Sequence, residues 1–413
     1  MLGSNNVGKR LTALLIALFI ILSAGAALFW RIEKMHAITG DEPHYLVIAD
    51  GLLPTFELEQ SGPYSREFRN RTIVESGLAA RDAVPSPANT HAETGPHGLF
   101  NVHNIGLPIL LAVPYLLGGE LGARLAMVLI GAFIVFLLVK VMSQTRLEPR
   151  QQFLVVLPVA LGLPFVTGAN QIYPDLPGGA ICLAAVCALL RGPMPGRARD
   201  GILTAILLAY LPWLHIRLAL SMAILLTAMA FAWRRQSTLI RSAIKFGSPA
   251  AISVLLLATY NWYAFGHVTG PYQSSDVMLN RIAIMQFLGL LFDQNQGIAL
   301  QQPLYFVAFF FAVRLLRKHP LALVAALISA LAMIGPNATH WNLYGGWSFS
   351  GRFGWGAATV LAPFVLLSLS TLMSESRRAG FVIVSLASLV QMRHLIAVFV
   401  QKRVLFPVSY THL

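Results

Sequence analysis

The chain has 413 residues, of which 56% are hydrophobic and only 11% are charged. Soluble globular domains carry about 25% charged residues, so this composition excludes a soluble enzyme and predicts an integral membrane protein. The net charge of +13 does not indicate a nucleic-acid partner, because the basic residues stand singly or in small groups between apolar runs, as topology signals do.

Eleven apolar runs are predicted to cross the membrane as helices, because a helix satisfies its own backbone polar groups inside a bilayer. The first run follows Lys9 and Arg10 and is longer than the h-region of a signal peptide, so we expect an uncleaved first helix. The run 105–118 is too short to span comfortably and predicts a re-entrant or interfacial helix. The predicted spans are 11–30, 120–142, 152–169, 176–190, 201–214, 217–233, 246–264, 302–317, 320–336, 354–373 and 380–400.

The basic residues orient these spans. With the N-terminus in the cytoplasm, the cytoplasmic segments hold 17 basic and three acidic residues, and the opposite side holds 10 basic and 14 acidic residues. This bias satisfies the positive-inside rule. The stretch "AITGDEPHYL", residues 37–46, and the whole loop 31–119 therefore face the extracytoplasmic side.

The loop 31–119 is the largest segment outside the predicted spans, and long loops in compact proteins are usually functional. Its part that begins at Glu42 predicts a short amphipathic helix on the membrane surface, with Pro43 in the first turn. The part 83–98 is rich in Pro, Gly, His and Thr and is predicted to be flexible.

Three acidic residues are candidates for chemistry on the extracytoplasmic side. Asp41 and Glu42 directly follow the first span; acids also favour a solvated helix N-terminus, but this position suits a general base toward a hydroxyl or an amine. Asp175 lies in a tight hairpin, where a lone acid is ordinarily a turn residue. Because Asp41 and Asp175 share a membrane face, they would hold either a divalent cation, such as Mg²⁺ or Mn²⁺, or an acceptor.

Basic side chains gather on the same face. Snorkelling is the common explanation for a single Arg, yet an ionisable group at membrane depth is a candidate for function, and Arg suits bidentate recognition of phosphate. The sequence therefore predicts an acid pair beside a phosphate clamp. The candidates for this clamp are His103, Arg217, His340 and Arg352.

Two other patterns predict little. The spacing of His91, Glu93, His97 and His103 matches no standard zinc pattern, so we do not expect zinc there. Cys182 and Cys187 lie in one apolar run and do not share a helix face, so they predict no disulfide framework.

Four stretches resemble motifs of the GT-C fold glycosyltransferases, in particular bacterial relatives of the protein O-mannosyltransferases and aminoarabinose transferases. "TGDEPHYL" resembles the acidic motif after the first span, and "YPD" resembles the acid of the second loop. "VHNIGLPILL" resembles the "HPPG" or "KPP" signature, with Asn104 and Ile105 in place of the usual prolines. "GGWSFSGRF" resembles the late pattern "GGWSxGPR", with Ser350 and Gly351 where Gly-Pro is common.

This resemblance covers roughly residues 10–370 and implies an all-α polytopic fold. It implies an enzyme of the inner, or plasma, membrane of a bacterium that moves a sugar from a polyprenyl-phosphate donor to an acceptor on the extracytoplasmic face, with inversion. Asp41 would be the general base, Glu42 would support it, and Asp175 would orient the acceptor or help to hold a metal. The substrate-binding residues would be His44, Tyr45, His103, Arg217, His340 and Arg352, of which Arg217 is added from topology alone.

Two alternatives remain from other classes. A flippase or transporter of lipid-linked sugars would place polar residues at mid-depth, where this chain is mainly apolar. A non-catalytic relative is the other alternative. We expect one domain over residues 1–400 and assign no function to 401–413, because "PVSYTHL" resembles a translated sequencing-adapter tail and indicates a truncated or chimeric end.

Overall fold

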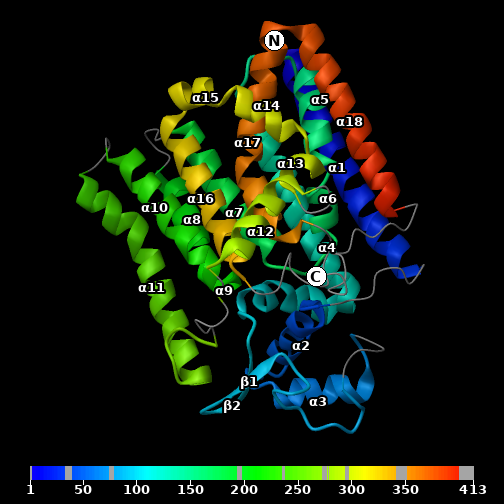
Figure 1. The fold of residues 1–413 in the computed structure, drawn as a ribbon, viewed down its shortest axis with the longest axis vertical. Coiled ribbons are helices and arrows are strands. Elements are labelled where there is room, and N and C mark those ends of the chain that lie inside the picture. Colours follow the sequence, from blue (N-terminus) through cyan, green and yellow to red (C-terminus); the bar gives the residue numbers. More distant parts are fainter. Residues whose placement is uncertain are drawn as a thin grey trace.

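The computed structural model describes residues 2–32, 40–73, 79–192, 198–234, 238–271, 277, 279–293, 297–340 and 351–399. Figure 1 shows these residues as an upright helix bundle above a smaller layer that contains α2, α3 and a two-stranded hairpin. The proposed tail 401–413 lies outside the described residues. The helices are α1 (Leu2–Ile32), α2 (Glu42–Leu52), α3 (Ser61–Asn70), α4 (Gly106–Met142), α5 (Pro149–Ala160), α6 (Phe165–Gly168), α7 (Asp175–Arg191), α8 (Ala198–Ala209), α9 (Leu211–Leu214), the 3₁₀ helix η1 (Ile216–Leu218), α10 (Ala219–Trp233), α11 (Leu239–Phe265), α12 (Arg281–Phe292), α13 (Ile298–Gln301), α14 (Leu304–Phe310), α15 (Ala312–Lys318), α16 (Pro320–Ala338), α17 (Arg352–Glu375) and α18 (Arg377–Phe399).

Within the described residues, seven helical segments are long and apolar enough to cross a membrane: α1, α4, η1 with α10, α11, α16, α17 and α18. The all-α polytopic prediction is thus confirmed, but the count of eleven spans is not. The predicted span 152–169 stops as α5 at Ala160, and the predicted span 201–214 is divided between α8 and α9. The predicted span 302–317 is divided at Phe311 between α14 and α15. The predicted span 176–190 lies on α7, whose 17 residues make it shorter than the seven spanning segments.

The helix predicted before the second span, either re-entrant or interfacial, exists as the first arm of α4. Gly118 and Gly119 leave helical geometry, with φ/ψ of −145°/15° and 56°/−143°, and divide α4 into two arms. A positive φ is accessible to glycine at little cost, which explains this residue type at the break. The arms then pack tightly, because a Cβ on Gly122 would stand 2.0 Å from the carbonyl oxygen of Pro114.

The lower layer corrects two expectations for the first loop. The helix that begins at Glu42 exists as α2, but nearly all of its residues are buried between α3 and α4, so it is not a surface helix. The segment 83–98, predicted to be flexible, instead contains strand β1 (Ala92–Gly95) and ends where its antiparallel partner β2 (Gly98–Asn101) begins. Gly95 seats this hairpin on α11, because a Cβ there would stand 1.7 Å from the carbonyl oxygen of Ala264.

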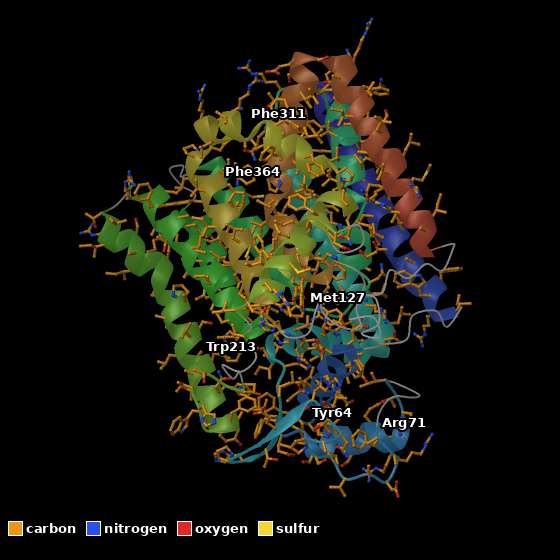
Figure 2. The ribbon with its side chains drawn as sticks, viewed as in Figure 1. Tyr64, Arg71, Met127, Trp213, Phe311 and Phe364 are labelled. Atoms are coloured by element: carbon orange, nitrogen blue, oxygen red, sulfur yellow. The ribbon has the colours of Figure 1, made fainter. Side chains whose placement is uncertain are left out.

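Each layer has its own buried aromatic residues. Figure 2 places Tyr64 in the lower layer and Phe364 inside the bundle, and both side chains are almost completely removed from solvent. The described part of the chain therefore has an apolar interior in the lower layer as well as between the long helices.

Close packing of α7 on α17 positions the candidate site. A Cβ on Gly179 would stand 2.9 Å from the Cβ of Thr359 and 3.1 Å from the Cα of Gly356. Small residues at a helix contact let the two backbones approach closely. The first residues of these helices, Asp175 and Arg352, consequently meet at one end of the bundle, next to the lower layer.

Candidate active site

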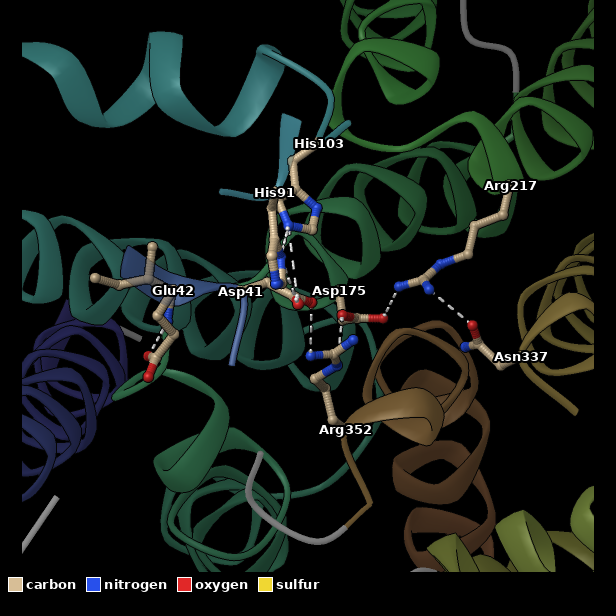
Figure 3. A network of polar contacts seen from close by, with 9 residues as sticks. Asp41, Glu42, His91, His103, Asp175, Arg217, Asn337 and Arg352 are labelled. Atoms are coloured by element: carbon tan, nitrogen blue, oxygen red, sulfur yellow. Dashed lines mark hydrogen bonds and ion pairs between the residues drawn. The ribbon is translucent and has the colours of Figure 1, made fainter. Parts of the chain in front are cut away.

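Asp41 lies where the lower layer meets the bundle. It precedes α2 as its N-cap residue, but its side chain makes no cap hydrogen bond. Instead, Nη1 of Arg352 donates to Oδ2 of Asp41 at 3.3 Å, while Oδ1 lies 3.8 Å from Nε2 of His103 and 3.9 Å from Nδ1 of His91 (Figure 3). The Asp41 side chain is 27% exposed, so a reacting group can reach it from solvent.

The surroundings of Asp41 keep it ionised. Burial alone would raise the pKa of Asp41, but His103, Arg352 and His91 together lower it more, and this pKa falls to about 2. Burial lowers the pKa of His103 to about 4, although the nearby Asp41 acts in the opposite direction. At neutral pH the site therefore presents a carboxylate and a neutral imidazole.

His44 is held by the lower layer. Its Nδ1 and the hydroxyl of Tyr64 share a hydrogen bond of 2.7 Å, and Nδ2 of Asn101 donates to the same hydroxyl at 2.8 Å. The ring of His44 stacks on that of His91, with centroids 3.7 Å apart. Burial lowers the pKa of His44 well below its ordinary value, and the nearby His91 and His103 lower it further. His44 thus supports the position of His91.

Asp175 lies between two arginine side chains at the start of α7. Nη2 of Arg217 donates a short hydrogen bond to Oδ1 of Asp175. On the other side, Nε of Arg352 is 3.8 Å from Oδ2 of Asp175, which is too far for a hydrogen bond. Both of these atoms are buried and have no hydrogen-bond partner among the described residues. A group that accepts from Arg352 or donates to Asp175 would therefore be stabilised here.

Asn337 fixes the second arginine. Its Oδ1 accepts a hydrogen bond of 2.7 Å from Nη1 of Arg217, and its Nδ2 donates to the carbonyl oxygen of Phe353 at 3.0 Å. Figure 3 shows Asn337 on the far side of Arg217 from Asp175. The guanidinium of Arg352 is held differently, because its central carbon lies 4.0 Å from the ring centre of Tyr173.

Glu42 follows Asp41 in sequence but points elsewhere. Its Oε1 accepts a hydrogen bond of 2.8 Å from the backbone N–H of Ile172, and Figure 3 shows it directed away from Arg352. The side chain is completely buried. Glu42 thereby joins the start of α2 to the segment that leads into Asp175.

The remaining predicted site residues lie around this network. The ring of Tyr45 lies 4.8 Å from that of His103, centre to centre. His340 forms an isolated β-bridge with Val277. Of the motif "GGWSFSGRF", residues 345–350 lie outside the described part of the chain.

One combination that we did not expect is Asp41 with His91 and His103. Their candidate ligand atoms all lie within 4.8 Å of one another, and Nδ1 of His91 is 3.2 Å from Nε2 of His103. This set combines His91 and His103, from the pattern in which we did not expect zinc, with the carboxylate of Asp41. His97 instead lies on the hairpin turn, with its Nδ1 2.8 Å from the carbonyl oxygen of Tyr263.

No family model and no curated protein matches the chain. Among solved structures it is similar to ArnT from Cupriavidus metallidurans bound to undecaprenyl phosphate, with 14% identity and a TM-score of 0.56 over 89% of this chain and 61% of that one. It is similar to the archaeal oligosaccharyltransferase AglB from Archaeoglobus fulgidus in complex with an inhibitory peptide and a dolichol-phosphate, with 12% identity and a TM-score of 0.53 over 95% and 56% of the two chains. A further match is an oligosaccharyltransferase of the same organism in complex with Zn and sulfate, with 14% identity and a TM-score of 0.52 over 95% and 54%.

These matches define the class of the fold. The chain has the GT-C fold of the membrane glycosyltransferases, as the four motifs implied. It spans about three fifths of the length of the ArnT structure. At such low identities the likeness establishes the fold alone, so the activity has to be argued from the site.

Proposed function

We propose that this protein is a membrane glycosyltransferase that moves a sugar from a polyprenyl-phosphate donor to an acceptor on the extracytoplasmic face, with inversion. The observation that carries the proposal is the contact between Asp41 of the first loop and Arg352 at the start of α17, with Asp175 beside them. The GT-C fold supports it, because ArnT was solved with undecaprenyl phosphate and AglB with a dolichol-phosphate.

Arg352 is the residue that we assign to the donor phosphate. Its Nε is buried with no hydrogen-bond partner in the described part of the chain, and its guanidinium is held over Tyr173. A phosphate oxygen would accept from this Nε, and charge-assisted hydrogen bonds of this kind are among the strongest in proteins. Arg217 lies on the other side of Asp175 and adds positive charge where the leaving phosphate gains negative charge.

Asp41 is the residue that we assign as general base. The acceptor oxygen forms a bond to the anomeric carbon while the bond from that carbon to the phosphate oxygen breaks, and the acceptor proton passes to Asp41. The low pKa of Asp41 keeps it ionised but makes it a weak base. Proton transfer therefore occurs late, when the attacking oxygen has already gained positive charge.

A divalent cation fits Asp41, His91 and His103 better than the predicted pair Asp41 and Asp175. Asp175 is already engaged by Arg217, whereas the two imidazoles have lowered pKa values and offer neutral nitrogens. Two imidazoles with one carboxylate suit Zn²⁺ or a similar transition metal, while Mg²⁺ prefers oxygen ligands. When bound, such a cation would stabilise negative charge on an acceptor oxygen.

The proposed placement follows the charge bias of the sequence. The protein would be an integral protein of a bacterial inner membrane with its N-terminus in the cytoplasm and Asp41 outside. Its partners would be the lipid-linked donor, the surrounding lipids and an acceptor that is a lipid, a glycan or a protein.

Transfer by the purified full-length protein in liposomes tests the proposal. Radiolabelled polyprenyl-phosphate sugars would be supplied with a panel of acceptors, and with water alone to detect hydrolysis of the donor. We expect Asp41→Asn to reduce transfer by about 10²–10⁴-fold with expression intact. The matched control is Asp50→Asn, also on α2, whose carboxylate pairs with Arg66 on the surface of the lower layer.

The two alternatives give different results in this experiment. Movement of the labelled lipid across the bilayer that survives Asp41→Asn, without any transfer, would identify a flippase. Absence of transfer, hydrolysis and translocation by the unsubstituted protein across the whole panel would favour a non-catalytic relative.

A further inference from the structure

A cavity lies at the opposite end of the bundle from Asp41. Its volume is about 420 Å³, and it is lined by the C-terminal turns of α4, α7 and α17 and by the α15–α16 junction. The site residues Asp175 and Arg352 begin α7 and α17, whereas this cavity is reached by Ser374 near the end of α17. At 1.5 Å per helical residue, about 30 Å separate the two ends. The cavity is therefore not part of the candidate active site.

The charged side chains that line this cavity are all basic or imidazole. They are Arg146 after α4, Lys318 at the end of α15 and His319 between α15 and α16. The acids close in sequence are engaged elsewhere, since Glu148 caps the first turn of α5 and Glu375 pairs with Arg314. The cavity consequently presents positive charge that no carboxylate among its lining residues neutralises.

Apart from Gln144, the other lining residues divide into hydroxyl-bearing and apolar groups. Ser370, Thr371 and Ser374 lie near the end of α17, and Thr145 follows α4. The hydroxyl groups of Thr371, Ser374 and Thr145 already donate to backbone carbonyl oxygens, so their oxygens are left to accept hydrogen bonds. The apolar groups are Val141 on α4, Leu190 on α7, Leu315 on α15 and Leu367 on α17. A ligand that suits this cavity therefore combines an anionic polar part with an apolar part.

We propose that this cavity binds a phosphate-bearing anion, supplied by the head group of an anionic phospholipid. The basic residues match the phosphate, the hydroxyl oxygens can accept from hydroxyl groups of the head group, and the apolar residues match the first carbons of the acyl chains. The cavity lies at the membrane end that carries most of the basic residues, which is the predicted cytoplasmic side. Binding there does not depend on the sugar-transfer activity.

Binding measurements on delipidated full-length protein in neutral detergent test this inference. The three ligands are dioctanoyl phosphatidylglycerol, dioctanoyl phosphatidylcholine and inorganic phosphate. We expect phosphatidylglycerol to bind about ten-fold more tightly than phosphatidylcholine. The double variant Arg146→Gln/Lys318→Gln should lose about ten-fold of this affinity, because both cations are removed from the cavity.

The matched control removes the same charge elsewhere on the same predicted side. Arg241→Gln/Lys245→Gln changes two residues of α11 that do not line the cavity, and it should leave the affinity for phosphatidylglycerol unchanged. A second cavity variant, Leu367→Trp, fills the space without altering charge and should also weaken binding. Because Arg146 and Lys318 are exposed on the rim, their replacement should not disturb folding.

The outcomes separate the two sources of phosphate. If inorganic phosphate binds tightly and the double cavity variant loses this binding, the cavity is an anion site, but a phospholipid is not the source of the anion. Equal binding of the two phospholipids, or an affinity that survives both cavity variants, would overturn the inference as a whole.

Discussion

Asp41 and Arg352 lie 311 positions apart in sequence, yet Nη1 of Arg352 is 3.3 Å from Oδ2 of Asp41. Asp41 in the first loop and Arg352 at the start of α17 thus form an ion pair where the lower layer meets the bundle. Such a pair forms only when the lower layer is docked on the bundle. The site therefore reports on the packing of the whole described fold, and changes in it need controls for folding.

Arg352→Lys should weaken the use of the donor more than the use of the acceptor. Lysine keeps the positive charge but loses the planar fork that offers Nε and Nη1 together. With sugar transfer as the assay, the donor KM should rise about ten-fold while the acceptor KM stays nearly constant.

The matched control for Arg352→Lys is Arg314→Lys, which changes an exposed ion pair with Glu375 at the other end of the bundle. It should leave both KM values unchanged. An equal rise of the donor and acceptor KM in Arg352→Lys would contradict the assignment of this residue to the phosphate.

Asn337→Ala should act through Arg217. The substitution removes the acceptor for Nη1 of Arg217 and the donor to the carbonyl oxygen of Phe353, and Asn337 is only 3% exposed. Loss of one partner from a buried hydrogen bond costs about 1–3 kcal/mol. The donor KM should rise, and a double-mutant cycle with Arg217→Ala should give a coupling energy of about 1 kcal/mol or more.

Asn261→Ala is the control for this cycle, because Asn261 is also buried and its Nδ2 donates to the carbonyl oxygen of Val268 at the end of α11. The effects of Asn261→Ala and Arg217→Ala on the free energy of unfolding should be additive, with no coupling energy between them. If Asn337→Ala and Arg217→Ala were also additive in donor KM, Asn337 would have no positioning role.

Much of the helical architecture could be predicted from the hydrophobic runs. Every predicted span overlaps a helix, although 152–169, 201–214 and 302–317 are each divided between two helices. Gly118 and Gly119 separate the predicted interfacial arm from the span that follows. The lengths were less predictable, because a run of apolar residues does not show where the chain leaves helical geometry. The predicted span 152–169 ends early, since the chain turns at Gly162 and Pro164 between α5 and α6.

The site was predicted in part for a similar reason. Position on one membrane face was enough to group Asp41, Asp175 and Arg352, whereas the role of His91 depends on strand pairing. The backbone N–H of Val102 donates to the carbonyl oxygen of His91, which brings this residue next to His103. The sequence "TGPHGLF" contains the signal, because a short turn flanked by Gly95 and Gly98 favours a hairpin. Asn337 gave no such signal, since its partners come from η1 and α17.

Metal content offers a test of the set Asp41, His91 and His103. The purified protein should carry about one zinc ion per chain, as measured by inductively coupled plasma mass spectrometry. His91→Ala and His103→Ala should each lose most of it, because three protein ligands would become two. His97→Ala should keep its zinc, since this residue lies on the hairpin turn against Tyr263. Zinc that persists in both of the first two variants would show that the metal is bound elsewhere.

Glu42→Ala should destabilise the protein, and Glu42→Gln should restore most of the loss. Alanine leaves the buried backbone N–H of Ile172 without the carboxylate oxygen that now accepts from it at 2.8 Å, whereas glutamine still presents an acceptor at the same distance from the backbone. The expected cost of the alanine variant is about 1–3 kcal/mol, seen as a melting temperature in detergent that is lower by a few degrees. Because Ile172 is three residues before Asp175, kcat should fall with the alanine variant as well.

Glu57→Gln is the control, since Glu57 forms a partly exposed pair with Arg66 and such pairs contribute about 0–1 kcal/mol. Were Glu42→Gln as inactive as Glu42→Ala at full stability, the charge of Glu42 rather than its hydrogen bond would be required, and Glu42 would return to the reaction as a partner of Asp41.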